Sequence, residues 1–488
     1  MRPEQTHQPS GAGAHGVQER LGRLPPRRAG RVLVPGELNT PGEKPDRGPN
    51  VVPQREPAHA PTTSPRWRAE RASCRKALSE PNAPTPHPVN PHPPAPAAHL
   101  TTPAAPLPIG EVDPQRNHVV VALDSFKGSL TARAATAALA RGLRRTGAHV
   151  VEHPVADGGE GTLDALLGAG FTEVPTPSTD ALGRPLTTRY ATRSSTAAIE
   201  LAESSGLAGI ADVPLTPARA RAATTLGAGR LIAAALNAGH RRIVVGLGGS
   251  ATTDGGAGML IALGARLLDR HGTPLDGTTS PLHEVHSLDL STLHPALRDA
   301  DVEVACDVDN PLLGPQGAAA IYGPQKGADP ALVTELNTSL TRWADLLEQA
   351  TTRSARDLPG AGAAGGTGFA LLACGARMRS GITLVLDLTN LPTALQGARL
   401  VIAGEGRVDH QTLHGKAPAG VAAAARAAGA PVVAVAGSCT LTPTELTRAG
   451  FTTAFTLTDL EPDLSRCHTE AAPLLERLGE HIAKTFPL

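Results

Sequence analysis

The sequence predicts an α/β fold, in which strands alternate with helices. Apolar runs rich in valine and isoleucine, at residues 119–123 and 243–245, each lead into a loop of small and polar residues and then into a helical pattern. Near the end of the chain, a strand at 398–403, a helix from about 420 and a strand at 431–437 form a βαβ unit. Open α/β sheets bind ligands beyond the carboxyl ends of their strands, so the loops that follow these strands are candidate sites.

Length and composition narrow the class of protein. A chain of 488 residues is expected to form two or three domains. Lys and Arg together number 45, as do Asp and Glu, so there is no electrostatic case for nucleic acid as a partner. No segment approaches the roughly 20 apolar residues of a membrane span, and the start lacks the apolar run of a signal peptide. The five cysteines are scattered, which favours a reduced, cytoplasmic setting away from membranes.

The first 117 residues read as a disordered tail. They contain 24 of the 45 prolines and no periodic apolar pattern, so nothing offsets the entropy of ordering them. They carry 15 Lys and Arg against 10 Asp and Glu. This composition could serve a weakly basic docking tail, but a dispensable extension is favoured.

The first ordered unit is a strand, a loop and a helix. The strand at 119–123 is followed by Asp124, Ser125 and Lys127, and Ser129 or Thr131 can cap the helix that runs to about residue 145. The three polar side chains therefore lie where an α/β sheet binds ligands. Taken alone, Lys127 is more typical of a solvated loop lysine than of a site residue.

A second strand, at 149–155, leads into two acidic residues among glycines. Asp157 and Glu160 could bind a metal ion or act as a base. They also have the spacing of a capping box, with Asp157 as N-cap and Glu160 three residues later, and both interpretations can hold.

The middle of the chain has a different pattern. Residues 186–192 and 196–201 alternate as half-exposed strands, and 230–239 is a helix with Gly239 as its C-cap. Thr224 and Thr225 stand at the start of that helix as possible phosphate contacts.

A glycine-rich loop at 246–258 is the most distinctive stretch. Six glycines surround Ser250, Thr252 and Asp254, and the absence of Cβ atoms at positions such as Gly248 and Gly249 would let a phosphate approach backbone N–H groups. Helical periodicity over 259–268 places the loop before a helix N-terminus, which attracts anions. The spacing matches neither a P-loop nor a dinucleotide-binding pattern, and a glycine-rich turn alone is weak evidence.

Further charged residues follow later strands. A strand at 302–306 ends in Asp307, Asp309 and Asn310, three oxygen donors suited to a hard cation, although an Asx-turn before Pro311 competes with that interpretation. Lys326 lies in a turn, and a second Gly/Ala-rich loop at 359–368 precedes a helix. The loop after the strand at 398–403 carries four charged residues: Glu405, Arg407, Asp409 and Lys416.

Seven motifs, in one order along the chain, resemble those of the glycerate kinase family of bacterial glyoxylate and glycerate metabolism. They are DSFKGS at 124–129, PVADGGEGT at 154–162, GGSATTDGGAGM at 248–259, ACDVDNPL at 305–312, GPQKGA at 323–328, PGAGAAGG at 359–366 and GEGRVDHQTLHGKAP at 404–418. The resemblance covers residues 118 to about 485. It departs from the family pattern at Thr253, where Asn is expected, and at Leu123, where Pro is usual. Neither departure removes an ionisable group.

The resemblance implies ATP-dependent phosphorylation of D-glycerate, at the 2- or the 3-hydroxyl, by two α/β domains with the active site in the cleft between them. A Rossmann- or flavodoxin-like domain would comprise 118–175 and 376–488, with a second α/β domain inserted at 176–375. There are two alternatives. One is a kinase for another small hydroxy acid, and the other is a non-catalytic nucleotide- or anion-binding protein of this fold. We expect a monomer or homodimer that uses ATP and Mg²⁺.

The motifs supply candidate residues for three roles. Catalytic roles are predicted for Lys127, Asp157 and Asp254. Substrate or phosphate contacts are predicted for Ser125, Gly248, Gly249, Ser250, Thr252, Lys326, Arg407 and Lys416. Metal ligands are predicted to be Glu160, Asp307, Asp309, Asn310, Glu405 and Asp409.

Overall fold

The computed structural model describes residues 116–413, 416–486 and 488. Contacts divide the chain into Met1–Pro96 and Ala97–Leu488, and all described residues belong to the second unit. The tail predicted for residues 1–117 therefore lies, apart from its last two residues, outside the described part. No helix in the described part is long and apolar enough to cross a membrane.

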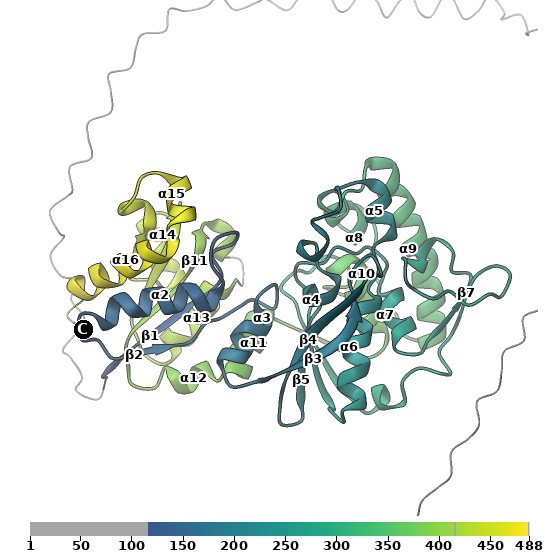
Figure 1. Ribbon diagram of the computed structural model, residues 1–488, viewed down its shortest axis with the longest axis horizontal. Coiled ribbons are helices and arrows are strands. Elements are labelled where there is room, and N and C mark those ends of the chain that lie inside the picture. Colours follow the sequence, from purple (N-terminus) through teal and green to yellow (C-terminus); the bar gives the residue numbers. More distant parts are fainter. Residues whose placement is uncertain (1–115, 414–415, 487) are drawn as a thin grey trace, which may run out of the picture. The chain divides into compact units, whose positions relative to one another are not determined.

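Segments from both ends of this unit form a five-stranded parallel sheet (Figure 1). β1 (His118–Leu123) lies between β2 (Val150–Glu152) and β11 (Ala398–Val408), and β12 (Val432–Cys439) and β13 (Ala454–Thr456) extend the sheet beyond β11. Val119 thus pairs with Leu400, far away in sequence. The predicted α/β sheet built from both ends of the ordered chain is confirmed.

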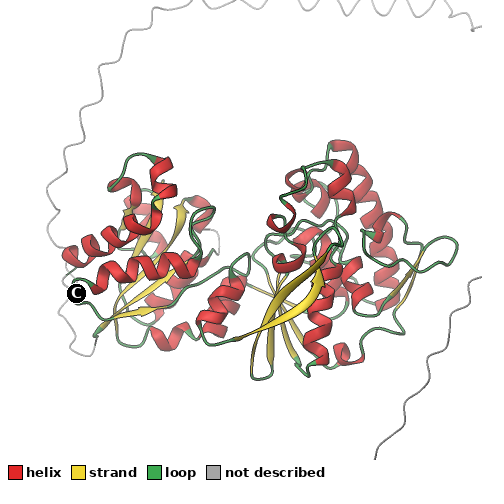
Figure 2. Cartoon of the chain, viewed as in Figure 1, coloured by secondary structure: helices red, strands yellow, loops and turns green. Residues whose placement is uncertain are grey.

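Alternate residues of these strands face opposite helical layers. Val119 and Val121 pack with α2 (Ala132–Arg144), α15 (Leu464–Thr469) and α16 (Ala471–Thr485). Val120 and Ala122 pack with α12 (Leu391–Ala394), α13 (Ala417–Ala427) and α14 (Pro443–Ala449). Because side chains alternate along a strand, strands covered on both faces are apolar throughout. Figure 2 shows helices on both sides of this sheet.

The second sheet has six strands in the order β10-β9-β6-β5-β4-β3. β3 (Thr172–Thr179), β4 (Pro185–Arg193) and β5 (Thr196–Glu200) are antiparallel neighbours, whereas β5, β6 (Arg242–Gly246), β9 (Asp301–Ala305) and β10 (Arg377–Arg379) are parallel. One face packs on α6 (Leu226–Asn237), α7 (Ala257–Ala262), α9 (Pro330–Thr351) and α10 (Ala363–Ala373). The other packs on α3 (Thr162–Gly168) and α11 (Gly381–Thr389).

Shorter elements complete the described part. The helices among them are α4 (Ala202–Ser205), α5 (Pro217–Ala222) and α8 (Ala318–Tyr322), and β7 (Arg266–Leu268) pairs with β8 (Ser287–Asp289). The predicted domain limits at 175/176 and 375/376 fall within β3 and just before β10. Because α3 and α11 share a core with the second sheet, we propose limits nearer residues 156 and 390.

Two local predictions need correction. The helix after the glycine-rich loop ends at Ala262, because Gly264 adopts a left-handed conformation (φ 96°) and the chain continues as β7. β5 is fully buried rather than half-exposed, because it is an interior strand between β4 and β6. Two predicted caps are confirmed: Thr131 accepts a hydrogen bond from the Ala134 N–H at the start of α2, and Gly239 follows α6 with φ 92°.

Candidate active site

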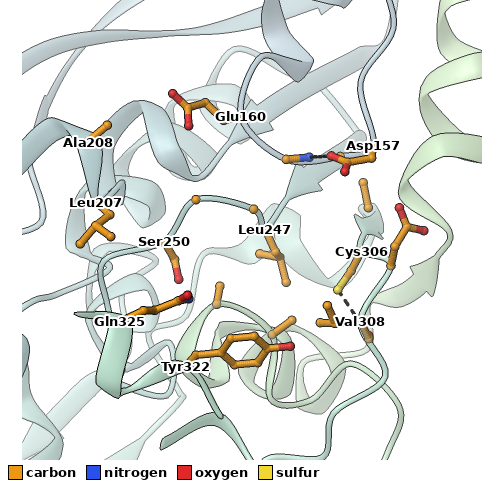
Figure 3. A pocket seen from close by; sticks show the side chains of 18 of the residues that line it. Asp157, Glu160, Leu207, Ala208, Leu247, Ser250, Cys306, Val308, Tyr322 and Gln325 are labelled. Atoms are coloured by element: carbon orange, nitrogen blue, oxygen red, sulfur yellow. Dashed lines mark hydrogen bonds between the residues drawn. The ribbon is translucent and has the colours of Figure 1, made fainter. Parts of the chain in front are cut away.

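A first cavity of about 610 Å³ opens at the carboxyl ends of β6 and β9 (Figure 3). Its walls come from the loops that follow β2, β6 and β9, from the end of α8 and from the start of α10. Seven of the predicted site residues line it: Asp157, Glu160, Gly248, Gly249, Ser250, Asp307 and Lys326. Loops that are far apart in the sequence therefore meet around one cavity.

Glycines let two loops touch at the edge of this cavity. A Cβ on Gly248 would lie 2.3 Å from the Cα of Gly159, so the backbones meet where any larger residue would separate them. Gly249 has φ 71°, which a glycine adopts without strain. The loop is thereby held against the segment that carries Asp157 and Glu160.

Lys326 lies buried beneath the same loop. Its Nζ donates hydrogen bonds to Ser250 Oγ (2.8 Å) and to the carbonyl oxygen of Thr252 (2.6 Å). Burial lowers the pKa of this lysine to about 7, and the nearby charge of Asp254 acts in the opposite direction. Ser250 faces the cavity, whereas Thr252 is fully buried and its hydroxyl has no hydrogen-bond partner among the described residues. Thr252 therefore contributes through its carbonyl and not through a substrate contact.

Asp254, predicted to be catalytic, is fully buried and lines none of the cavities described here. Its carboxylate accepts hydrogen bonds from the N–H groups of Gly256 and Gly258 and from the N–H and hydroxyl of Thr225. Burial raises its pKa, and these donors oppose that shift. The anion at the start of α7 is thus the protein's own carboxylate, where a phosphate was expected.

Thr224 and Thr225 are also structural rather than phosphate contacts. Both are fully buried. Thr224 donates to the carbonyl oxygen of Gly277, and Thr225 donates to Asp254 while it accepts from the Met259 N–H. Their hydroxyls join the start of α6 to the glycine-rich loop.

Two carboxylates of the first cavity are anchored by backbone N–H groups. Asp157 Oδ1 accepts from Gly159 N (3.1 Å) and Asp307 Oδ1 accepts from Gly381 N (2.9 Å). Burial raises the pKa of Asp307, and the negative charge of Asp157 adds to the increase. These two side chains are close enough to interact and are both suited to a divalent cation.

The capping box expected from Asp157 and Glu160 does not form. α3 begins after Gly161, which makes no side-chain cap, and the free N–H groups of Gly161 and Leu163 donate to the two carboxylate oxygens of Glu200. Glu200 comes from the end of β5, and burial raises its pKa to about 7. Glu160 is consequently free of capping and is exposed at the rim of the cavity.

The predicted grouping of Asp307, Asp309 and Asn310 as metal ligands is not assembled. Asn310 accepts a hydrogen bond from the Tyr322 hydroxyl (2.6 Å) and donates to the carbonyl oxygen of Gln316 (2.8 Å), so its side chain shapes the loop. Asp309 is exposed and lies outside the cavity wall. Among residues 116–413 and 416–486, no three His, Cys, Asp or Glu side chains gather closely enough to hold a metal ion.

A second cavity, of about 430 Å³, opens beyond β1, β11 and β12. Predicted site residues supply much of its wall: Ser125, Lys127, Glu405, Arg407, Asp409 and Lys416. Glu405 accepts a hydrogen bond from the Thr412 hydroxyl (2.8 Å), and Lys416 Nζ lies 4.0 Å from its other oxygen. Burial raises the pKa of Glu405. The hydrogen bond from Thr412 and the positive charge of Lys416 act in the opposite direction. Arg407 and Asp409 form a 3.4 Å ion pair beside them.

A third cavity, of about 420 Å³, is lined by the loop between β1 and α2 on one side and by residues near β4 and β5 on the other. Lys127 and Ser125 contribute from the loop after β1, and Glu160 and Arg189 contribute from the other side. Lys127 therefore borders both the second and third cavities, and Glu160 borders both the first and third.

Asp124 was expected at a strand end but was not among the predicted site residues. It is buried directly after β1, and its Oδ1 accepts from the Ser125 N–H (2.6 Å). Burial, together with the negative charges of Asp157 and Glu405, raises its pKa to about 7. Its position at the end of a parallel strand was the available signal, but burial cannot be read from one loop residue.

Residues 119–487 match the family model described as the glycerate kinase family. The chain belongs to the glycerate kinase family. A protein named glycerate kinase from Bacillus subtilis (strain 168) is 42% identical, over 76% of this chain and 98% of its own length. A protein named glycerate 2-kinase from Escherichia coli (strain K12) is 43% identical, over 66% of this chain and 85% of its own.

A solved structure agrees with the family's fold. The crystal structure of putative glycerate kinase 2 from Salmonella typhimurium LT2 matches with a TM-score of 0.64 and 41% identity. The match covers 76% of this chain and 98% of that chain. The resemblance inferred from the seven motifs is confirmed, and this glycerate kinase family member is an enzyme of the phosphotransferase class.

Proposed function

We propose that this chain transfers the γ-phosphoryl group of ATP to a hydroxyl group of D-glycerate. The observation that carries the proposal is the position of Asp157. It lines the first cavity, and its charge raises the pKa of Asp124 and Glu405, from the first sheet, and of Asp307, from the second. Carboxylates that follow strands of both sheets thus lie close enough together to act in one reaction centre.

Phosphoryl transfer requires positioning and charge neutralisation more than covalent chemistry. Lys127, Arg407 and Lys416 supply cations at the second cavity for the carboxylate of glycerate and for phosphoryl oxygens. Glu405, which lines the second cavity and whose pKa is raised by burial, is suited to accept the proton of the attacking hydroxyl group. Asp124 is buried outside the walls of the three cavities and, together with Asp157, adds negative charge beside Glu405. In this scheme Asp254 positions the glycine-rich loop and does not touch the substrate.

The donor set also suits Mg²⁺. This ion usually binds one or two carboxylates, together with waters and substrate phosphates, so a three-residue protein cage is not needed. Asp157 and Asp307 would hold it. When bound, it would neutralise charge on the phosphates. We expect that excess chelator abolishes activity and that added Mg²⁺ or Mn²⁺ restores it. Full activity in the presence of chelator would exclude a metal requirement.

The decisive experiment measures ADP release from ATP with D-glycerate and Mg²⁺, with L-glycerate, glycolate and lactate as competing acceptors. D-glycerate should be the preferred acceptor. Absence of ADP release with D-glycerate alone, while another acid reacts, would make this a kinase for a different hydroxy acid. No release with any acceptor would favour the non-catalytic binding protein.

The name of the Escherichia coli relative supports transfer to the 2-hydroxyl group. Phosphorus–proton NMR of the product tests this. Coupling of the phosphorus to one methine proton identifies 2-phosphoglycerate, whereas coupling to two methylene protons identifies 3-phosphoglycerate.

We further propose that the enzyme acts in the cytoplasm as a monomer or homodimer. The supply of ATP there and the scattered cysteines support the location. Light scattering coupled to gel filtration distinguishes the two assembly states.

A further inference from the structure

Apolar side chains that glycerate does not need form part of the lining of the first cavity. Leu207, Leu247, Val308 and the ring of Tyr322 line it, and Figure 3 shows Tyr322 across the cavity from Asp157 and Glu160. Glycerate has a polar group on each of its three carbons and offers no apolar face to such a wall. A purine base does, and a cavity of about 610 Å³ falls within the range of sites that bury a ligand much larger than glycerate.

A nucleotide also needs hydrogen-bond donors for its phosphate oxygens, and Ser250 can supply one. Its Oγ accepts a hydrogen bond from Lys326 Nζ, so its own hydroxyl hydrogen is left to donate elsewhere. Within residues 116–413 and 416–486, the structure shows no acceptor for it. Ser250 lines the cavity, so the available direction is toward a bound ligand.

On the basis of the proposed kinase function, we propose that the first cavity is the nucleotide site. The base packs on the apolar wall, and Ser250, oriented by Lys326, donates to a phosphate oxygen. D-Glycerate is taken by the second cavity, whose wall is richer in cations. Lys326 acts through Ser250 and is a positioning residue.

The charges around the cavity explain why a buried lysine is placed there. Asp157, Glu160 and Asp307 face the cavity, Asp254 lies beneath the loop, and Lys326 is the cation among the lining residues. Mg²⁺ would reduce the electrostatic repulsion between these three carboxylates and the phosphates. Because burial lowers its pKa to about 7, Lys326 gives up its proton more readily than a solvated lysine, whereas a bound phosphate favours its charged form. Binding of the nucleotide at pH 8 is therefore coupled to uptake of a proton.

The test is calorimetric titration of the full chain with MgADP and, separately, with D-glycerate. Ser250→Ala removes the donor, and Ser438→Ala is the matched change in the wall of the second cavity. Ser250→Ala should weaken MgADP binding by roughly tenfold or more and leave D-glycerate binding and the melting temperature unchanged. Ser438→Ala should leave MgADP binding unchanged. If D-glycerate alone gives no heat, it is titrated in the presence of MgADP.

Three results would overturn the assignment: normal MgADP binding in Ser250→Ala, weakened D-glycerate binding in that variant, or weakened MgADP binding in Ser438→Ala. A second measurement addresses Lys326. Titrations at pH 8 in buffers of different ionisation enthalpy should show proton uptake with MgADP in the wild type and less in Lys326→Met. Equal uptake in both would remove Lys326 from the proposal. If Lys326→Met does not fold, the comparison of Ser250→Ala with Ser438→Ala still tests whether the first cavity is the nucleotide site.

These measurements need no turnover. A chain that binds MgADP through Ser250 but does not phosphorylate D-glycerate would refute the proposed reaction and retain the nucleotide site. A chain that phosphorylates D-glycerate while Ser250→Ala binds MgADP normally would refute only this inference.

Discussion

Lys127 and Lys416 both line the second cavity, but their local environments differ. Lys127 is exposed in the loop after β1. Lys416 occupies the N-cap position of α13, where the positive end of the helix disfavours a cation. A lysine placed against the helix dipole, 4.0 Å from a buried glutamate, is better explained by binding of an anion than by stability.

Replacement of either lysine by methionine should reduce kcat/KM by roughly tenfold to a hundredfold, because a charge-assisted contact contributes about 1.5–3 kcal/mol. The free energy of unfolding should change by no more than about 0.5 kcal/mol. Lys484→Met, on the exposed side of α16, is the control and should leave both quantities unchanged. Normal kinetics in both variants would remove these lysines from the site, and a large loss of stability would make them structural.

His153 gives a pH dependence with a defined sign. It is buried after β2, with Nε2 2.9 Å from the Thr389 hydroxyl, and burial lowers its pKa from 6.5 to about 4. Between these values the unfolded chain binds a proton that the folded chain does not. The stability from this residue is therefore present above pH 6.5 and is lost as pH falls toward 4, by about 3 kcal/mol in all.

Urea unfolding of the wild type and of His153→Gln at several pH values measures this contribution. The wild type should lose more stability than the variant between pH 6.5 and 4, whatever their difference at neutral pH. Parallel curves for the two proteins would show that the imidazole protonates in the folded state without cost.

The limits of sequence reasoning are clearest among neighbouring residues. Polar residues that follow apolar strands could be expected to lie near one another, because ligand-binding groups in α/β sheets gather at the carboxyl ends of the strands. It could not separate Ser250, which faces a cavity, from Thr252 and Asp254, which are buried, because a glycine-rich loop has no periodicity from which to read direction. Whether the carboxylates share one ion or divide between two substrates depends on distances between loops far apart in sequence.

At the scale of elements, α3 shows how a short helix can be capped from another strand. Its first turn receives no help from its own N-cap, and Glu200 of β5 accepts from two of its N–H groups. The sequence favoured Asp157 and Glu160 for this role because a capping box is a local pattern, whereas Glu200 lies 37 residues from Leu163. The parallel βαβ units and their interior strands were predictable, because apolar runs mark them directly.

Glu200→Gln should therefore destabilise the protein by about 1–3 kcal/mol, because an amide offers one oxygen where two N–H groups need acceptors and turns its own N–H₂ toward one of them. Equilibrium unfolding in urea measures the loss. Glu284→Gln, an exposed residue, is the control and should change stability by less than about 0.5 kcal/mol. Equal stability of the two variants would show that water or another group caps α3.

At the scale of the whole molecule, the first 118 residues lie outside the part of the sequence that matches the family. The family match begins at residue 119, and the Bacillus subtilis relative is matched over 98% of its length by 76% of this chain. The described part begins with Arg116, whose guanidinium donates to the carbonyl oxygen of Ala398, and Asn117, whose N–H donates to Gly397.

Deletion of residues 1–110 should accordingly leave the melting temperature and kcat/KM essentially unchanged. A shorter chain beginning at residue 118 is the informative comparison, since it also loses the contacts of Arg116 and Asn117 with the segment before β11. An insoluble or several-fold slower product of the first deletion would assign the tail a role in the enzyme.

The pairing of β1 with β11 also bears on how the protein is made. During synthesis β1 and its first neighbour β2 emerge early, yet β11, the second neighbour of β1 in the sheet, follows only after the whole second sheet has been translated. The second sheet can form all its hydrogen bonds first. Until β11 is made, the edge of β1 that will pair with it stays unpaired, and its apolar residues stay exposed. A ribosome that stalls or terminates before β11 would release a chain with that edge uncovered, a form prone to self-association and degradation.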